Sequence, residues 1–346
     1  MHSPTARFVK LRLLPAREMR YHFHMTSERT ADFPRRTLED MVNDCLEGAP
    51  CDLDVRYGEP MSGHCTFGVG GPADCFLRPS GEGFRAFAAA LLARAGAQGV
   101  PVFVLGGGAN IVVADSGIPG IVLDMGGWTG EAGRTEGGMR FRSGTELDDA
   151  ARVAAEAGLS GLEFLAGMPG TVGGAVWMNA RCYGREISDV LRETEGLDPA
   201  VNPPEGFRLP ADPAEFGYKR SPFQDRRSLI LYASFRLVPG DPGAIRTEME
   251  GYRRDRLDKG HFRFPSAGSV FKNNPAFGGP TGKIIDGLGL RGLRIGGAQV
   301  APWHGNIIVN TGGASASDIR ALTLDLAARV RAATGFELEP EILFVP

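Results

Sequence analysis

The sequence lacks a hydrophobic run long enough to cross a membrane and lacks a strong excess of either charge. A membrane-spanning helix needs about 20 predominantly apolar residues in a row, and the apolar runs of this 346-residue chain are much shorter. The formal net charge is −3 at pH 7, so the overall charge does not favour nucleic acid as the main partner. With 42% hydrophobic residues, the chain is predicted to form a soluble protein of two or three domains.

Cysteine and histidine are too scattered for several common kinds of site. The five cysteines lack the paired Cys-x-x-Cys spacing of zinc and redox sites, so we interpret them as free thiols in a reducing cytoplasm. The six histidines are dispersed, and no Ser-His-Asp arrangement has a recognisable spacing. The sequence therefore predicts no metal site, and it indicates that any catalytic set must be built differently.

The first 36 residues differ from the rest because basic residues outnumber acidic ones there. They also lack the uninterrupted apolar core of a secretory signal, since Lys10 and Arg12 divide the stretch 8–15. We predict that residues 1–40 form a basic, disordered extension. Two alternatives stay open, an Arg-rich organellar transit peptide and a true start at Met25.

Glycine, by contrast, is abundant, with 49 residues or about twice the usual share of ~7%. Segment 161–180, GLEFLAGMPGTVGGAVWMNA, combines many glycines with large apolar residues and little charge. Glycine lets backbone amides approach a ligand, and successive amides turned the same way form an anion-binding concavity. The segment therefore predicts backbone laid against a ligand; a Gly-rich surface loop is the alternative.

A second glycine-rich turn, Gly106 to Asn110, lies between apolar strands predicted at 102–105 and 111–113. It is not the dinucleotide fingerprint, because that motif opens a helix. Its free amides suit a pyrophosphate, although a plain hairpin turn would look the same. Two such turns in one chain suggest one long anionic ligand that carries a diphosphate, such as a dinucleotide.

Hydrophobic periodicity predicts a mixed α and β chain without internal repeats. Helical spacing of apolar residues is found at 37–46, 83–99, 144–158, 239–260, 283–295 (with a turn at its end) and 315–334. Further strands are predicted at 187–197, 228–237, 305–310 and 338–345.

Some polar residues are candidates for chemistry on their own pattern. Ser269 stands among small residues with Lys272 close behind, although it could simply be a small residue in a tight turn. Glu339 and Glu341 flank Pro340 in the last predicted strand and would point to the same face. The alternative for both glutamates is that their carboxylates lie in solvent at the edge of a sheet.

Taken together and in order, several stretches make the chain resemble the UDP-N-acetylenolpyruvoylglucosamine reductases (MurB), and in particular their type II branch. These flavoenzymes complete UDP-N-acetylmuramate in peptidoglycan synthesis. The resemblance covers roughly residues 60–345. It rests on TFGVGGPAD (66–74), VLGGGANIVVAD (104–115), GLEFLAGMPGTVGGAVWMNA (161–180), FGYKRSPF (216–223), FPSAGSVFKNNP (264–275), GKIIDGLGLRGLRIGGAQV (282–300) and LEPEI (338–342).

The resemblance implies an α+β fold of the vanillyl-alcohol-oxidase type, in which two FAD-binding subdomains are joined by a substrate-binding domain. It also implies a cytoplasmic protein, which we expect to be a monomer. The expected division is an extension at 1–40, FAD-binding subdomain 1 at 41–124 rejoined by a C-terminal strand at 338–346, FAD-binding subdomain 2 at 125–258, and a substrate-binding domain at 259–337.

The resemblance further implies FAD as cofactor and NADPH as its reductant, with UDP-N-acetylglucosamine enolpyruvate as the second substrate. The FAD diphosphate would lie on the two glycine-rich turns, and the flavin along the end of the second. The residues implied are Gly106, Gly107, Gly108, Ala109, Asn110, Gly167, Met168, Pro169, Gly170, Thr171, Gly173, Gly174 and Ala175.

In this family hydride goes to C3 of the enolpyruvyl group and a proton goes to C2. By resemblance, Ser269 is the proton donor and Glu341 is the glutamate beside the substrate carboxylate, acting as an acid or through a shared proton. Tyr218, Lys259 and Asn273 match positions that hold the UDP-sugar. Neither a metal nor nucleic acid is implied.

The chain departs from the family pattern at several anion-binding positions. Lys219, followed by Arg220, stands where the family usually has an arginine that polarises the substrate carboxylate. Lysine keeps the charge but not the bidentate fork, so either residue is a candidate catalytic cation. Ala109 replaces a common phosphate-binding serine, and Leu343 replaces a frequent arginine. Two other functions therefore stay open, a flavin oxidase of the same fold and a nucleotide-binding regulatory protein that has lost turnover.

Overall fold

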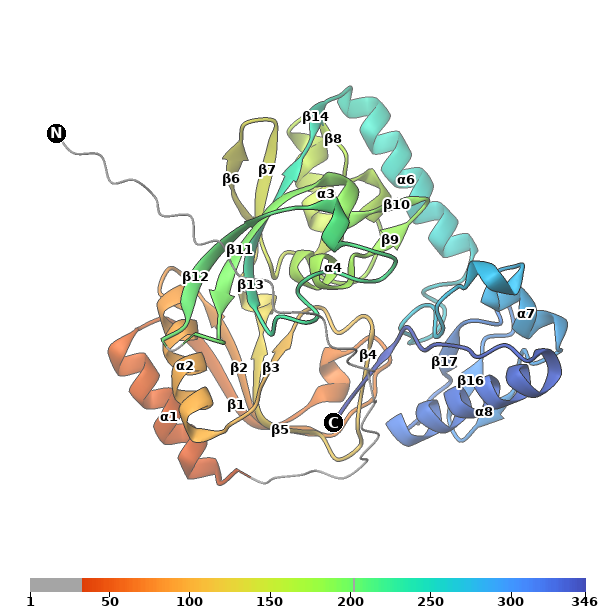
Figure 1. Ribbon diagram of the computed structural model, residues 1–346, viewed down its shortest axis with the longest axis horizontal. Coiled ribbons are helices and arrows are strands. Elements are labelled where there is room, and N and C mark those ends of the chain that lie inside the picture. Colours follow the sequence, from red (N-terminus) through yellow and green to blue (C-terminus); the bar gives the residue numbers. More distant parts are fainter. Residues whose placement is uncertain (1–32, 202) are drawn as a thin grey trace.

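The computed structural model describes residues 33–201 and 203–346, and three larger sheets divide this part of the chain into three units (Figure 1). The first unit holds a four-stranded sheet of order β1-β2-β5-β3. Strands β1 and β2 are antiparallel, whereas β5 is parallel to both β2 and β3. Its elements are α1 (Arg35–Gly48), β1 (Asp52–Pro60), β2 (Pro72–Ser80), α2 (Phe84–Gln98), β3 (Val102–Leu105) and β5 (Ile118–Asp124).

Helix α1 starts earlier than the domain boundary predicted at residue 40. Its buried side chains follow helical spacing, and they pack in one core with α2 and β2: Leu38, Met41, Val42 and Cys45. Helix α1 therefore already includes residues 35–40, which the predicted division had assigned to the extension. Residues 1–32 of the predicted extension lie outside the described residues.

The second unit is built on a five-stranded antiparallel sheet of order β12-β11-β13-β7-β6. One hydrophobic core joins it to α3, α4 and α6. The elements are β6 (Glu131–Thr135), β7 (Gly138–Arg142), α3 (Leu147–Glu156), α4 (Val172–Met178), β11 (Leu191–Asp198), β12 (Glu205–Pro210), β13 (Leu229–Arg236) and α6 (Pro242–Asp258). Two short pairs, β8 (Leu159–Ser160) with β14 (Val238–Pro239) and β9 (Arg181–Cys182) with β10 (Arg185–Glu186), form separate two-stranded sheets.

The strand predicted at 187–197 begins instead as a helical turn, α5 (Ile187–Val190). Glu186 and Asp189 form a capping box, in which each side chain accepts a hydrogen bond from the other residue's backbone amide. This local pairing outweighs the β-propensity of Ile187 and Val190. The strand β11 therefore starts only at Leu191.

The third unit packs two helices on a small antiparallel sheet of order β15-β16-β17. Its long helix begins at a capping box between Ser315 and Asp318 and ends before Gly335, which has a left-handed backbone. The elements are α7 (Thr281–Gly287), β15 (Arg294–Ile295), β16 (Ala298–Val300), β17 (Ile308–Asn310) and α8 (Ala316–Thr334).

After α8 the chain returns to the first unit, as the blue C-terminal segment of Figure 1 shows. Its last strand, β18 (Leu343–Val345), pairs in parallel with β4 (Ile111–Val113). Because β3 belongs to the four-stranded sheet and β4 pairs with β18, the turn 106–110 does not close a hairpin. The plain hairpin interpretation of this turn is therefore wrong. None of the helices in the described ranges is both long and apolar enough to cross a membrane.

Candidate active site

The two glycine-rich turns lie directly against each other. A methyl group added to Gly107 would lie 2.7 Å from the Cα of Gly170. One added to Gly106 would lie 2.7 Å from Oγ1 of Thr171. Only glycine permits this approach of two backbones. The two turns, which are far apart in the sequence, thus form one cradle of backbone. Its glycines stand where a side chain would collide with the opposite turn.

The second turn enters helix α4 through a tightly held backbone. The amide of Val172 donates to the carbonyl of Thr145 (2.8 Å), and that of Gly173 donates to the carbonyl of Ser143 (2.7 Å). A methyl group on Gly173 would lie 2.8 Å from Cβ of Ser143. Gly174 is exposed and has no such obstruction beyond Thr171. The backbone of Val172 and Gly173 is therefore held in place, whereas Gly174 is open to solvent.

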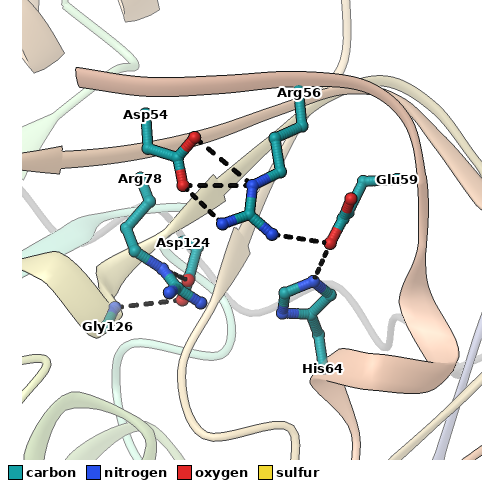
Figure 2. Close-up of polar contacts among 7 residues, drawn as sticks. All are labelled: Asp54, Arg56, Glu59, His64, Arg78, Asp124 and Gly126. Carbon is teal, nitrogen blue, oxygen red and sulfur yellow. Dashed lines mark hydrogen bonds and ion pairs between the residues drawn. The ribbon is translucent and has the colours of Figure 1, made fainter.

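The first turn is fixed on its other side by the residues that follow β1. Gly108 has a φ of +60°, and a methyl group there would lie 2.0 Å from the carbonyl oxygen of His64. Figure 2 shows how His64 is held: its Nε2 lies 2.8 Å from Oε1 of Glu59, which accepts a hydrogen bond from Nη1 of Arg56 (3.0 Å). Arg56 in turn binds Asp54. These contacts hold His64 against the end of β1, and the carbonyl of His64 lies close to Gly108 of the turn.

Backbone amides of the cradle remain available for a ligand. Among the described residues, the amides of Gly107, Gly108, Ala109 and Gly170 donate to no other protein group. Backbone donors are nearly always paired in a folded protein, and amides in such a turn form an anion-binding concavity. A cradle of unpaired donors that no side chain can fill suits a diphosphate. The residues present therefore fit FAD.

A buried ion pair lies beside this cradle. Nζ of Lys219 is 2.8 Å from Oε1 of Glu341, and the two side chains are only 13% and 10% exposed. The carbonyl of Glu341 accepts from Nδ2 of Asn110 (2.9 Å), and the amide of Leu343 donates to the carbonyl of Asn110 (2.9 Å). The last residue of the first turn thus holds the backbone of the ion-paired carboxylate.

Lys219 points inward because of a strained turn. Gly217 and Arg220 exchange two backbone hydrogen bonds of 3.0 Å, and Lys219 between them has a left-handed φ of +58°. Such a backbone is unusual for a residue with a long side chain, and it often marks a functional position. Arg220 instead pairs with Asp225 (3.5 Å), and its side chain is 71% exposed. Of the two candidate cations, only Lys219 reaches the buried carboxylate.

Ser269 is next in sequence to a residue that bonds Glu341. It follows Gly268, which has a φ of +71°, and it pairs in β-bridge geometry with Ile307. The next residue, Val270, accepts a backbone hydrogen bond from the amide of Glu341 (2.7 Å). The segment of Ser269, from the third unit, is therefore joined through its backbone to Glu341 of the C-terminal segment, which pairs with Lys219 of the second unit.

The expected substrate-binding residues extend outward from this group. The hydroxyl of Tyr218 accepts from the amide of Asn273 (3.3 Å), and Oδ1 of Asn273 accepts from the amide of Thr281 at the start of α7 (2.9 Å). Lys259, at the end of α6, pairs with Asp255 (2.7 Å). Tyr218 and Asn273 are thus in contact with each other, whereas Lys259 binds a separate partner.

Comparison with known proteins decides the family. The model of the UDP-N-acetylenolpyruvoylglucosamine reductase C-terminal domain matches residues 260–345, and an FAD-binding domain model matches 86–200. The chain is 40% identical over 333 residues to the UDP-N-acetylenolpyruvoylglucosamine reductase of Treponema pallidum, covering 84% of this chain and 93% of that protein. The chain belongs to the UDP-N-acetylenolpyruvoylglucosamine reductase family. A relative from Synechococcus is 39% identical, with 83% and 90% covered.

A solved structure supports the same family. The crystal structure of the reductase (MurB) from Thermus caldophilus matches with a TM-score of 0.68 and 32% identity. The match covers 86% of this chain and all of that one. Together with the FAD-binding domain match, it confirms the expected α+β fold of the vanillyl-alcohol-oxidase type.

The contact between the turns gives a first testable prediction. We expect Gly107→Ala to weaken FAD binding by more than about tenfold, which corresponds to about 1.4 kcal/mol. The added methyl group would meet the backbone of Gly170 and push the two turns apart. The measurement is the FAD content of the purified variant and its loss on dilution.

Gly96→Ala in α2 is the matched control for this variant. Its methyl group would have no heavy atom within 4 Å, and alanine favours the helix by up to about 1 kcal/mol. It should keep its FAD and melt no lower than the unmodified protein. Normal FAD retention by Gly107→Ala would show that the contact of the two turns does not control cofactor binding.

Sequence reasoning did not identify two residues that hold Lys219. Nδ2 of Asn179 donates to the carbonyl of Gly217 (2.9 Å), and Nε2 of Gln224 donates to the carbonyl of Lys219 (3.0 Å). Asn179 follows α4 with a left-handed φ of +44°, a helix-terminal position that favours asparagine. That preference could have marked it as a cap, but its contact with Gly217 depends on the folded chain.

Proposed function

We propose that this chain is an FAD-dependent reductase that converts UDP-N-acetylglucosamine enolpyruvate to UDP-N-acetylmuramate with NADPH, in cytoplasmic peptidoglycan precursor synthesis. Family membership supports the activity. The observation that carries the chemistry is the buried pair of Lys219 and Glu341, 2.8 Å apart and held by Asn110 of the glycine cradle. It brings a cation and a carboxyl group to the edge of the cofactor site.

The cofactor would be held mostly by backbone. The unpaired amides of Gly107, Gly108 and Ala109 are suited to its diphosphate, and the backbone would carry more of this contact because Ala109 replaces a serine. When bound and reduced by NADPH, FAD supplies the hydride that is added to C3 of the enolpyruvyl group. Gly173, Gly174 and Ala175 line the continuation of the cradle, where the flavin would lie.

Lys219 is proposed as the cation that stabilises the developing negative charge. Addition of hydride to C3 places charge on C2 and on the substrate carboxylate. A largely buried ammonium stabilises such charge more strongly than a solvated one, because the local dielectric constant is low. Lys219 acts as a point charge, without the two-pronged hydrogen bonding that arginine would give.

Ser269 is proposed as the donor of the proton that C2 receives. An unassisted serine is a weak acid, so its hydroxyl must act on a strongly basic carbon in a polarised site. Glu341 lies next to this segment and is proposed to act beside the substrate carboxylate, either as an acid or by sharing a proton. Its ion pair with Lys219 keeps its carboxyl group oriented before the substrate arrives.

Tyr218, Lys259 and Asn273 are proposed to bind the UDP-sugar part. Binding energy from this remote nucleotide can orient the reacting end of the substrate. The contact between Tyr218 and the backbone of Asn273 supports a shared role, since it joins the Lys219 turn to the third unit.

The experiment is steady-state turnover by the purified protein. The protein should be yellow, and its consumption of NADPH should depend on UDP-N-acetylglucosamine enolpyruvate. A yellow protein that consumes NADPH only with oxygen would indicate a flavin oxidase of the same fold. A protein that binds nucleotides without any turnover would indicate a regulatory protein, and either result would contradict the proposal.

A further inference from the structure

Arg256, in the last turn of α6, is buried, and no carboxylate of the described residues pairs with it. It is 7% exposed, and its buried Nε has no hydrogen-bond partner in this part of the chain. Within the described ranges, the guanidinium makes no ion pair; its Nη2 donates to Sγ of Cys182 (2.9 Å). Arginine is almost never this buried unless it is paired, and leaving a buried charge uncompensated is unfavourable.

The thiol of Cys182 does not compensate this charge. Burial is the largest influence on Cys182 and raises the pKa of its thiol, although the nearby Arg256 acts in the opposite direction. Cys182 is therefore a neutral thiol at pH 7, and sulfur is a weak acceptor. Arg256 also faces the ring of Tyr183 at 5.7 Å, but an aromatic face offers much less than an anion. A strong partner for the guanidinium has to come from outside the described residues.

The surroundings of Arg256 indicate which anion that is. Its Cδ is 3.3 Å from the position of a methyl group on Gly167, the first residue of the second glycine-rich turn. Lys259 follows three residues later, and its positive charge, like that of Arg256, acts to lower the pKa of the Cys182 thiol. Arg256 thus lies near the start of the second glycine-rich turn and near a residue proposed to bind the UDP-sugar.

Nearby histidines do not supply the same charge. Burial lowers the pKa of His261, and the positive charge of Arg256 lowers it further. Burial likewise lowers the pKa of His304. Both imidazoles are neutral at pH 7. Asp255 pairs with Lys259 and the hydroxyl of Tyr183 rather than with Arg256. Among the described residues, neither imidazole adds to the charge of Arg256 and Asp255 does not neutralise it.

We propose that Arg256 binds a phosphate of a bound nucleoside diphosphate. A guanidinium can donate two parallel hydrogen bonds to phosphate oxygens from one planar group, which the ammonium of Lys259 cannot do. This inference rests on the proposed function, which supplies two ligands that carry a diphosphate. One is the UDP-sugar, proposed to bind near Lys259, and the other is FAD, near Gly167. Arg256 would make up for the phosphate contact that the chain lacks at Ala109 if FAD is the source.

The test compares Arg256→Gln with Arg254→Gln, an exposed arginine of the same helix. UDP and uridine, which has no phosphate, are titrated into each holoenzyme by calorimetry, and the FAD content of each is measured. If the UDP-sugar is the source, Arg256→Gln weakens UDP binding about 10- to 100-fold with uridine binding and FAD content unchanged. If FAD is the source, the variant loses FAD by a similar factor, and Arg254→Gln does not.

A folding defect is separated from a binding role by Arg256→Lys and Cys182→Ala. Arg256→Lys keeps the charge and should recover part of the lost affinity, whereas Cys182→Ala, which removes only the thiol contact, should leave nucleotide binding intact. Wild-type FAD content together with an unchanged ratio of UDP to uridine affinity in Arg256→Gln would overturn the proposal. If the unmodified holoenzyme binds no UDP, the proposed function fails, and FAD retention by Arg256→Gln alone then decides the role of Arg256.

Discussion

Ser269→Ala is expected to lower the rate of substrate reduction by about 10²- to 10³-fold or more, while reduction of the protein by NADPH proceeds at its normal rate. The hydroxyl of Ser269 is needed only when C2 receives its proton, which belongs to the second half-reaction. Rapid mixing measures each half separately, first the oxidised protein with NADPH and then the reduced protein with UDP-N-acetylglucosamine enolpyruvate.

Ser266→Ala is the matched control for Ser269→Ala. Ser266 lies in the same segment and is half-buried like Ser269, but it has no assigned role, so both half-reactions should stay close to normal. An equal fall of both half-reactions in Ser269→Ala would mean that Ser269 shapes the site rather than donating a proton. In that case its assignment as the acid would be wrong.

Lys219→Ala is expected to lower substrate reduction by about 10²- to 10³-fold, whereas Arg220→Ala changes it less than about fivefold. The difference follows from geometry: Nζ of Lys219 is 2.8 Å from the buried carboxylate of Glu341, and Arg220 makes an exposed pair with Asp225. Exposed ion pairs contribute only about 0–1 kcal/mol. The measurement is the single-turnover rate with saturating enolpyruvyl substrate.

Lys219→Arg distinguishes loss of charge from loss of fold. It keeps a cation at the same position and should retain far more activity than Lys219→Ala. Because Lys219→Ala leaves Glu341 buried without its partner, its melting temperature should fall as well, so both variants are compared by their rate per bound FAD. Equal small losses in Lys219→Ala and Arg220→Ala would show that neither is the catalytic cation.

Local patterns in the sequence were sufficient for most elements of the fold. The apolar repeat of α8 and its capping residues Ser315 and Asp318 are contiguous, so the helix could be predicted closely. The start of β11 could not, because the capping box of Glu186 and Asp189 competes with β-branched residues. The contact of the two glycine-rich turns depends on tertiary packing, and the sequence showed only that both had free backbone.

The choice between Lys219 and Arg220 shows why part of the site could not be predicted from the sequence. Adjacent residues in a turn can point to opposite sides, and the left-handed φ of Lys219 decides which one turns inward. That conformation is held by Asn179 and Gln224, whose contacts exist only after folding. Among the described residues Arg256 has no carboxylate partner, and this too is invisible in the sequence, since Asp255 and Asp258 lie within two positions of it.

Anaerobic mixing of the NADPH-reduced protein with UDP-N-acetylglucosamine enolpyruvate tests the proposed activity without interference from oxygen. If the chain is the reductase that we propose, the protein is reoxidised in one exponential phase without oxygen, and one equivalent of UDP-N-acetylmuramate forms per FAD. If the reduced protein persists with this substrate and is reoxidised only when oxygen is admitted, the chain is not this reductase.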